Sequence, residues 1–547
     1  VEVTDPALPG AGQFLGHWID ANTVAWPANL APDPADTMWQ LWGDADGGLV
    51  LADGKVTGGT GEPATLLGTL AYDPTCLTSA QLENRKHLSG FLALRLSLAD
   101  GVTIGDVLTG QVMVLQAAKA GTPQVFTGLQ IPGVLDDLYA ESARQADLGV
   151  TFDGDVPTLR VWAPTARTVA LELFDGLDAS TTPTTVPMTR AADGTWSVTG
   201  TAGWENRAYR YAVEVYAPST GEVVTNSVTD PYSVGLTLNS TASVVLDLSD
   251  PAWAPALWKD TESPQIDQFV DRTIYELHIR DFSVSDETVP ENLRGTYAAF
   301  ALEGTDGITR LGELADAGMN TIHLLPSFDI ATIEEDRAAQ AVPAIPTDAA
   351  PDSEAQQAAV TTVADADGFN WGYDPFHFNA PEGSYASAGN QDGGARTAEF
   401  RSMVGGLHRT GYQVVLDEVF NHTAQSGQGD KSVLDQVVPG YYHRLSLAGS
   451  VETSTCCQNV ATEHEMAEQL MVDSVVTWAR DYRVDGFRFD LMGHHSFDNM
   501  VTVRAALDEL TLADDGVDGK TIYLYGEGWN FGEVADNARF TQATQGQ

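Results

Sequence analysis

The chain has 547 residues, and 76 acidic against 28 basic side chains give it a formal net charge of −48 at pH 7. A field of that sign repels phosphate backbones and anionic lipid, so we expect neither nucleic acid nor a membrane surface as a partner. Three cysteines cannot form a disulfide scaffold in so long a chain, and 9% aromatic with only 19% charged residues argue against disorder.

Residues 1–140 are predicted to form a first β-rich domain, because short apolar runs alternate with Gly/Asp turns. Two strands are expected at 16–20 and 23–27, and they carry Trp18 and Trp26. The two indoles suit either a sugar-binding platform or a packed core, and we favour the core.

Residues 141–258 are predicted to form a second β-rich domain. Alternating apolar residues mark short strands near 159–163, 169–173 and 209–213. Many short strands at regular spacing favour a sandwich, so both N-terminal domains are expected to be sandwich-like.

Residues 259–547 show a different pattern, in which strands alternate with helices. Strands are expected at 273–279, 321–326, 413–416, 484–489 and 521–525, with helices near 308–318, 395–410, 462–482 and 498–510. Thr462 and Glu465 are spaced as a capping box at the start of the third helix. Alternation of this kind predicts a parallel sheet. Five strands instead of eight predict an incomplete (β/α)8 barrel, the TIM barrel.

Polar side chains follow three of these strands. Asp417 ends one strand, Arg488 and Asp490 end the next, and Glu527 ends the last. Because Arg488 and Asp490 are two positions apart, they point to the same side, and an arginine beside a carboxylate favours its ionised form. Glu527 stands near Trp529, in less polar surroundings that suit a proton donor. Two such carboxyl groups on adjacent strands are typical of a glycosidase.

Three segments resemble the signatures of the α-amylase family, glycoside hydrolase family 13: residues 417–422, 486–490 with His494, and 526–529. Residues 370–375, 485–493 and 526–534 are similar to the branch of type I pullulanases and limit dextrinases. The first region resembles the N-terminal domain of these enzymes, and the second resembles a family 48 carbohydrate-binding module.

The resemblance implies a starch-debranching hydrolase that cleaves α-1,6 linkages in pullulan, amylopectin and limit dextrins with net retention. Its partner would be an α-glucan polysaccharide or oligosaccharide. Asp490 matches the nucleophile, Glu527 the acid/base and Asp417 the structural carboxylate behind Arg488. The substrate-binding positions are Tyr373, Asp374, His422, Arg488, His494 and Trp529. Alternatives are an isoamylase or glycogen-debranching specificity, or a noncatalytic glucan-binding fragment.

One departure from the family is the missing fourth signature, a His-Asp pair expected after Glu527. We therefore expect a truncated chain, whose barrel is completed either by a complementary C-terminal polypeptide or by further residues of the same polypeptide. The chemistry needs no cofactor, and Asn421 is a weak candidate ligand for a structural calcium ion. No signal segment is visible; a secreted or cell-surface protein of the bacterial type is expected, with an intracellular location as the alternative. For the adjacent Cys456 and Cys457 we favour thiols over a disulfide.

Overall fold

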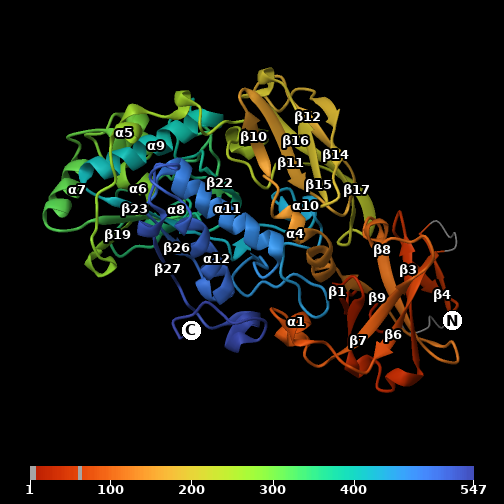
Figure 1. The fold of residues 1–547 in the computed structure, drawn as a ribbon. Helices are drawn as coiled ribbons and strands as arrows, with labels where there is room; N and C mark the ends of the chain where they lie inside the picture. The colour runs from red at the N-terminus through yellow and green to blue at the C-terminus, as the bar shows by residue number, and fades with distance from the viewer. Residues whose placement is uncertain (1–7, 60–63, 547) are drawn as a thin grey trace.

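A computed structural model describes residues 8–59 and 64–546, and its elements form three units that follow one another along the chain (Figure 1). The first unit, red to orange, is a closed barrel of seven strands. In barrel order these are β1 (Gly16–Asp20), β2 (Thr23–Pro27), β7 (Phe91–Leu98), β6 (Thr65–Asp73), β3 (Thr37–Asp44), β8 (Gln111–Ala118) and β9 (Pro123–Gln130). Smaller elements are β4 (Val50–Ala52), β5 (Lys55–Thr57), α1 (Ser79–Leu82), α2 (Ile104–Val107), α3 (Pro132–Leu135) and α4 (Glu141–Ala143).

The barrel closes where β9 pairs in parallel with β1, with Gly16 opposite Leu129. Closure leaves the sheet without a free edge. The prediction of a sandwich-like first domain is therefore wrong, because this pairing joins residues far apart in the sequence that no local pattern connects. Trp18 and Trp26 are 1% and 0% exposed in the barrel core, which confirms their interpretation as core residues.

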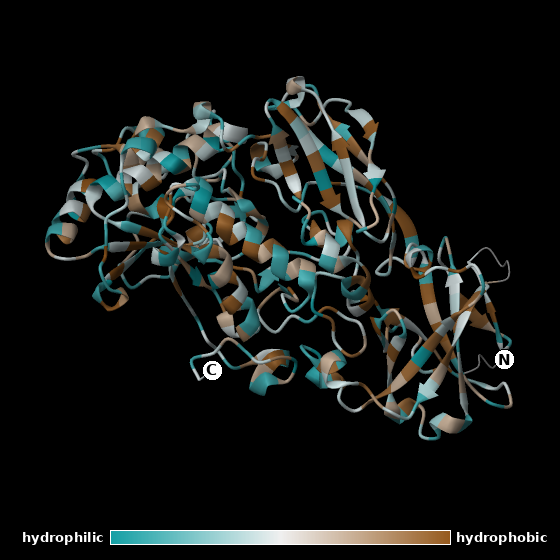
Figure 2. Cartoon of the chain, viewed as in Figure 1, coloured by the Kyte–Doolittle hydropathy of each residue, from teal (hydrophilic) through white to brown (hydrophobic). Residues whose placement is uncertain are grey.

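The second unit is a sandwich of two sheets, as predicted. One sheet contains β10 (Gly149–Asp153), β11 (Val156–Trp162), β15 (Thr195–Thr199) and β14 (Thr189–Arg190). The other contains β13 (Thr184–Pro187), β12 (Ala166–Leu173), β16 (Ala208–Ala217) and β17 (Glu222–Val228), with β18 (Ser243–Val244) paired to β16. Alternate residues such as Leu159, Val161, Leu171 and Val213 are buried in one shared core. Figure 2 shows this alternation as brown segments along the strands.

The third unit, green to blue, contains five parallel strands in the order β19 (Ile274–Leu277), β20 (Thr321–Leu324), β23 (Gln413–Glu418), β26 (Gly486–Phe489) and β27 (Tyr523–Gly526). Its helices are α5 (Ala256–Asp260), α6 (Ile279–Ser283), α7 (Asp306–Asp316), α8 (Ala355–Thr361), α9 (Gly393–Thr410), α10 (Leu434–Val437), α11 (Glu465–Tyr482) and α12 (Phe497–Asp508). Two short pairs are β21 (Phe328–Ile330) with β22 (Pro375–Pro381), and β24 (His422–Thr423) with β25 (Gln458–Asn459). All five predicted strands and four predicted helices are therefore present.

The sheet of the third unit is open within the described ranges, since neither β19 nor β27 pairs with a further strand there. The central strands β20, β23 and β26 are fully buried, whereas β19 is mostly exposed. Long apolar runs are expected for parallel strands covered on both faces. Among the described residues, no helix combines the length and hydrophobicity needed to cross a membrane.

The predicted capping box at Thr462 is wrong, because α11 begins at Glu465 with His464 as its N-cap residue. The Thr462 hydroxyl contacts His495 Nδ1 (2.8 Å) and donates to Asn499 Oδ1 (3.2 Å). Asn499 instead belongs to the capping box that Ser496 forms at the start of α12.

A buried polar network joins the second unit to the third. His377 on β22 contacts Thr229 Oγ1 through Nε2 (2.6 Å) and Asp329 through Nδ1 (2.6 Å). Arg396 on α9, which is fully buried, donates to Glu335 (2.9 Å), and the backbone N–H of Glu335 donates to Asn239 Oδ1 (2.8 Å). Because such groups are costly to bury without partners, each unit supplies partners that the other needs.

Candidate active site

The carboxyl ends of β23, β26 and β27 lie side by side in the open sheet. Asp417 is paired in register with Arg488, and Arg488 is paired in turn with Tyr525. Asp490 and Glu527 directly follow β26 and β27, so they leave the sheet at the same edge. The structure thus brings together predicted residues from three separate segments.

Arg488 contacts all three carboxylates at this edge. Its Nη1 lies 2.6 Å from Asp417 Oδ1 and 3.0 Å from Asp490 Oδ1, while its Nη2 lies 2.5 Å from Glu527 Oε1. The Arg488 side chain is only 10% exposed, and the adjacent Asp417 and Asp490 carboxylates raise its pKa despite its burial. One permanently charged guanidinium therefore holds Asp490 and Glu527 close to each other. We call these four residues the Arg488 cluster.

Asp490 is largely enclosed, with a side chain that is 12% exposed. Burial raises its pKa from 3.8 to about 6, although the hydrogen bond from Asn421 and the charge of Arg488 act in the opposite direction. Asn421 Nδ2 donates to Asp490 Oδ2 (2.8 Å) and to its backbone oxygen (3.0 Å). Arg488 thus favours ionised Asp490 as expected, but burial has the larger effect.

Glu527 occupies a more open position. Its side chain is 35% exposed, and the backbone N–H of Leu491 donates to Oε2 at 3.4 Å. Trp529, two residues further on, is 58% exposed, so its indole is free to meet a molecule from solvent.

Tyr373 and His422 lie next to the Arg488 cluster. The Tyr373 hydroxyl donates to Asp417 Oδ2 (2.7 Å), and His422 Nε2 lies 2.8 Å from the Tyr373 backbone oxygen. Burial lowers the pKa of His422, which favours its neutral form. Both ring nitrogens of His422 already have protein partners, whereas the Tyr373 hydroxyl, which donates to Asp417, can still accept a hydrogen bond from a sugar hydroxyl.

Two predicted substrate-binding residues make contacts with residues outside the Arg488 cluster. Asp374 accepts a hydrogen bond from the Thr332 hydroxyl (2.6 Å). His494 is fully buried, its ring packs edge-on against Phe531 (4.7 Å between centroids), and burial lowers its pKa to about 4. Its Nδ1 lies 3.4 Å from Arg444, so its sugar contact stays a prediction.

Residues that the sequence reading missed also support this site. His323 Nε2 lies 3.2 Å from Asp417 Oδ2, and its ring contacts Tyr525 edge-on. Glu418 is buried, and burial beside Asp417 raises the pKa of its carboxyl well above the usual value. The sequence did offer one signal for His323, since it is a polar residue inside the otherwise mostly apolar strand 321–325.

Cys456 and Cys457 form a disulfide, so the preference for two thiols is wrong. Cys456 Sγ lies 3.7 Å from His422 Nε2, which places the disulfide beside the site. No local sequence feature separates the two states, because adjacent cysteines are compatible with both.

Asn421 does not fit the role of a calcium ligand. Its Oδ1 lies 2.6 Å from His422 Nδ1, and its Nδ2 donates to Asp490, so both amide atoms are engaged. Calcium prefers oxygen ligands that are free to approach it at about 2.3–2.6 Å.

Comparisons with known proteins match two family models: the Pullulanase N2 domain at residues 15–137 and Carbohydrate-binding module 48 (Isoamylase N-terminal domain) at residues 147–233. Pullulanase 1, chloroplastic, from Arabidopsis thaliana is 37% identical over 97% of this chain and 54% of the relative. A crystal structure of a Klebsiella pneumoniae PulA mutant in complex with maltotriose superposes with a TM-score of 0.88. It shows 32% identity and covers 98% of this chain and 60% of that one.

This chain belongs to the type I pullulanase family. It spans about half the length of the curated pullulanases it matches. An isoamylase from Pseudomonas amyloderamosa is 31% identical, but over only 40% of this chain and 26% of the relative. The Arg488 cluster thus lies in a chain whose long matches are to pullulanases.

Proposed function

We propose that the protein is a starch-debranching hydrolase that cleaves α-1,6-glucosidic linkages in pullulan, amylopectin and limit dextrins. The observation that carries this proposal is the contact of Arg488 with Asp417, Asp490 and Glu527 at one sheet edge of a pullulanase-family chain. The structural relative bound to maltotriose supports an α-glucan as the substrate class.

The proposed mechanism is a double displacement with retention. Asp490 attacks the anomeric carbon while Glu527 gives its proton to the departing glycosidic oxygen, so that a β-glucosyl ester forms on Asp490. Glu527 then takes a proton from water, which attacks the same carbon and releases Asp490. Arg488 and Asn421 orient the nucleophile, and the two carboxyl groups carry out these steps without a cofactor.

We also propose that the five-stranded sheet is part of a (β/α)8 barrel. Exposed apolar residues near its free edge support this: Val270 is 84% exposed, Phe269 52% and Tyr275 42%. A complementary polypeptide that adds strands beside β19 and β27 would cover them.

The test of this function is product analysis with pullulan. The protein, joined to any polypeptide that completes it, is expected to release maltotriose, detected by chromatography. Activity on amylopectin without activity on pullulan would favour the isoamylase specificity. Retention on amylopectin without any product would favour the noncatalytic binder.

A secreted or cell-surface location is proposed on separate grounds. The Cys456–Cys457 disulfide supports it, because disulfides persist in oxidising compartments. A structural calcium ion has no support from Asn421.

The rate of hydrolysis is expected to fall as the pH drops through about 6. Asp490 attacks only when ionised, and its folded-state pKa is about 6, so the ionised fraction decreases below that pH. Asn421→Ala removes a donor to the carboxylate and is expected to move this acidic limb upward by about one pH unit. Rates of pullulan hydrolysis between pH 4 and 8 measure the acidic limb of the unsubstituted protein and that of Asn421→Ala.

The control for this profile is Asn292→Ala, which changes an exposed asparagine in the same unit. It is expected to leave the acidic limb in place. An unchanged limb in Asn421→Ala would show that Asp490 does not set it.

A further inference from the structure

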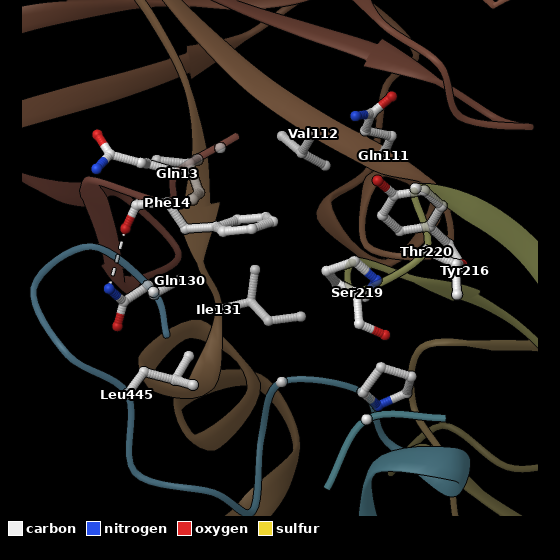
Figure 3. A pocket seen from close by; sticks show the side chains of 18 of the residues that line it. Gln13, Phe14, Gln111, Val112, Gln130, Ile131, Tyr216, Ser219, Thr220 and Leu445 are labelled. Atoms are coloured by element: carbon white, nitrogen blue, oxygen red, sulfur yellow. Dashed lines mark hydrogen bonds between the residues drawn. The ribbon is translucent and has the colours of Figure 1, made fainter. Parts of the chain in front are cut away.

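A cavity lies where the three units meet, and we call it the junction cavity (Figure 3). Its volume is about 670 Å³, within the range of about 300–1,000 Å³ found for ligand sites. The first unit contributes residues 110–113 and 128–131, the second contributes 216 and 218–221, and the third contributes 426–427 and 449–451, among others. None of its lining residues belongs to the Arg488 cluster.

The lining of the junction cavity is almost free of charge. Of its 28 residues only Asp435 is charged, in a chain where 19% of residues are charged. The Asp435 carboxylate accepts from the backbone N–H groups of Gly427 (2.7 Å) and Gly440 (3.0 Å) and lies 3.2 Å from His443 Nδ1. Nothing in this lining favours an ion, so the cavity suits a neutral ligand.

The walls combine aromatic surface with unused hydroxyl groups. In Figure 3 the Phe14 ring extends into the cavity above Ile131, with Ser219 on the opposite side. Within the described ranges, the hydroxyls of Tyr216 and Ser219 make no hydrogen bond to protein, and Thr165 Oγ1 is buried without a partner. Apolar ring faces beside free hydroxyls match a sugar, whose own faces are apolar and whose edges are polar.

Two glutamines hold this wall in shape. Gln130 Nε2 donates to the backbone oxygens of Phe14 (2.9 Å) and Ser446 (2.8 Å), which ties the first unit to the third. Gln111 Oε1 accepts from the backbone N–H of Leu49 (2.6 Å). A site that is formed before its ligand arrives loses less entropy on binding.

We propose that the junction cavity binds a short linear α-1,4-linked glucose oligosaccharide, separately from the catalytic edge. The choice of an α-glucan rests on the proposed function, while the choice of a neutral sugar rests on the lining. Bound there, the oligosaccharide contacts all three units at once.

The test is hydrogen–deuterium exchange of the chain with and without maltotriose. Binding is expected to slow exchange in segments 110–113 and 216–221. Ser219→Trp places an indole at an exposed rim position and is expected to abolish that slowing, whereas Ser180→Trp, at an exposed site of the same unit, keeps it. Unchanged exchange at saturating maltotriose, or slowing that survives in Ser219→Trp, would overturn the proposal.

Tyr216→Phe provides a second test that leaves the ring in place. It is expected to weaken maltotriose binding at the junction segments about 3- to 10-fold, as the loss of one hydrogen bond predicts. An unchanged affinity would count against the proposal. If maltotriose slowed hydrogen exchange at 110–113 and 216–221 in a protein that does not hydrolyse pullulan, the proposed function would be refuted and the proposed cavity site would stand. Only the exchange of these two segments reports on the cavity.

Discussion

Asp490→Asn is expected to lower pullulan hydrolysis by at least about 10⁴-fold in a preparation that releases maltotriose, because an amide cannot form the glycosyl ester. The shape of the site should persist, since an asparagine keeps an oxygen for Arg488 Nη1, now 3.0 Å away. Initial rates at saturating pullulan measure the loss, and binding of maltotriose measured alongside is expected to change little.

The matched control is Asp498→Asn, the same change on the exposed face of α12. It is expected to leave the rate within about twofold, as for most surface substitutions. Full turnover by Asp490→Asn would refute its role as the nucleophile, and an equal loss in both variants would indicate a folding defect.

Glu527→Gln is expected to lower pullulan hydrolysis by about 10²–10⁴-fold, because the departing sugar oxygen then receives no proton. The first step should suffer much less with an α-maltotriosyl fluoride, whose leaving group needs no proton. Azide, which attacks the ester without base assistance, is expected to restore turnover and to yield the α-glycosyl azide. Product analysis by NMR measures both the rescue and the configuration.

Glu509→Gln, an exposed change at the end of α12, is the control for this variant. Neither the fluoride substrate nor azide should restore turnover in it, because no turnover is lost. If Glu527→Gln lost pullulan and fluoride hydrolysis equally and azide had no effect, Glu527 would not be the proton donor. Its role would instead be to hold Arg488 in position.

The central strands of the third unit were predictable because they are covered on both faces. The run at 413–418 ends in Asp417 and Glu418, and the run at 486–489 contains Arg488 and is followed by Asp490, so one local pattern marks both the strand and its functional end. This explains why Asp417, Arg488, Asp490 and Glu527 were found together from the sequence.

Closure of the first barrel and the supporting contacts of the site were not predictable in the same way. The β1–β9 pairing and the contact of His323 with Asp417 depend on residues that only the folded chain brings together. His494 was assigned to substrate binding through the family resemblance, and that contact stays a prediction. The sequence did not indicate that the turn after β26 packs its ring edge-on against Phe531.

The buried network around Arg396 has a consequence for the order in which the protein is made. Synthesis runs from the N-terminus, so Thr229 and Asn239 leave the ribosome before Asp329, Glu335 and Arg396. The finished sandwich can therefore serve as a template on which the later carboxylates find their partners. In a circularly permuted gene that translates the sandwich last, the contacts of Thr229 with His377 and of Asn239 with Glu335 would be the last of this network to form.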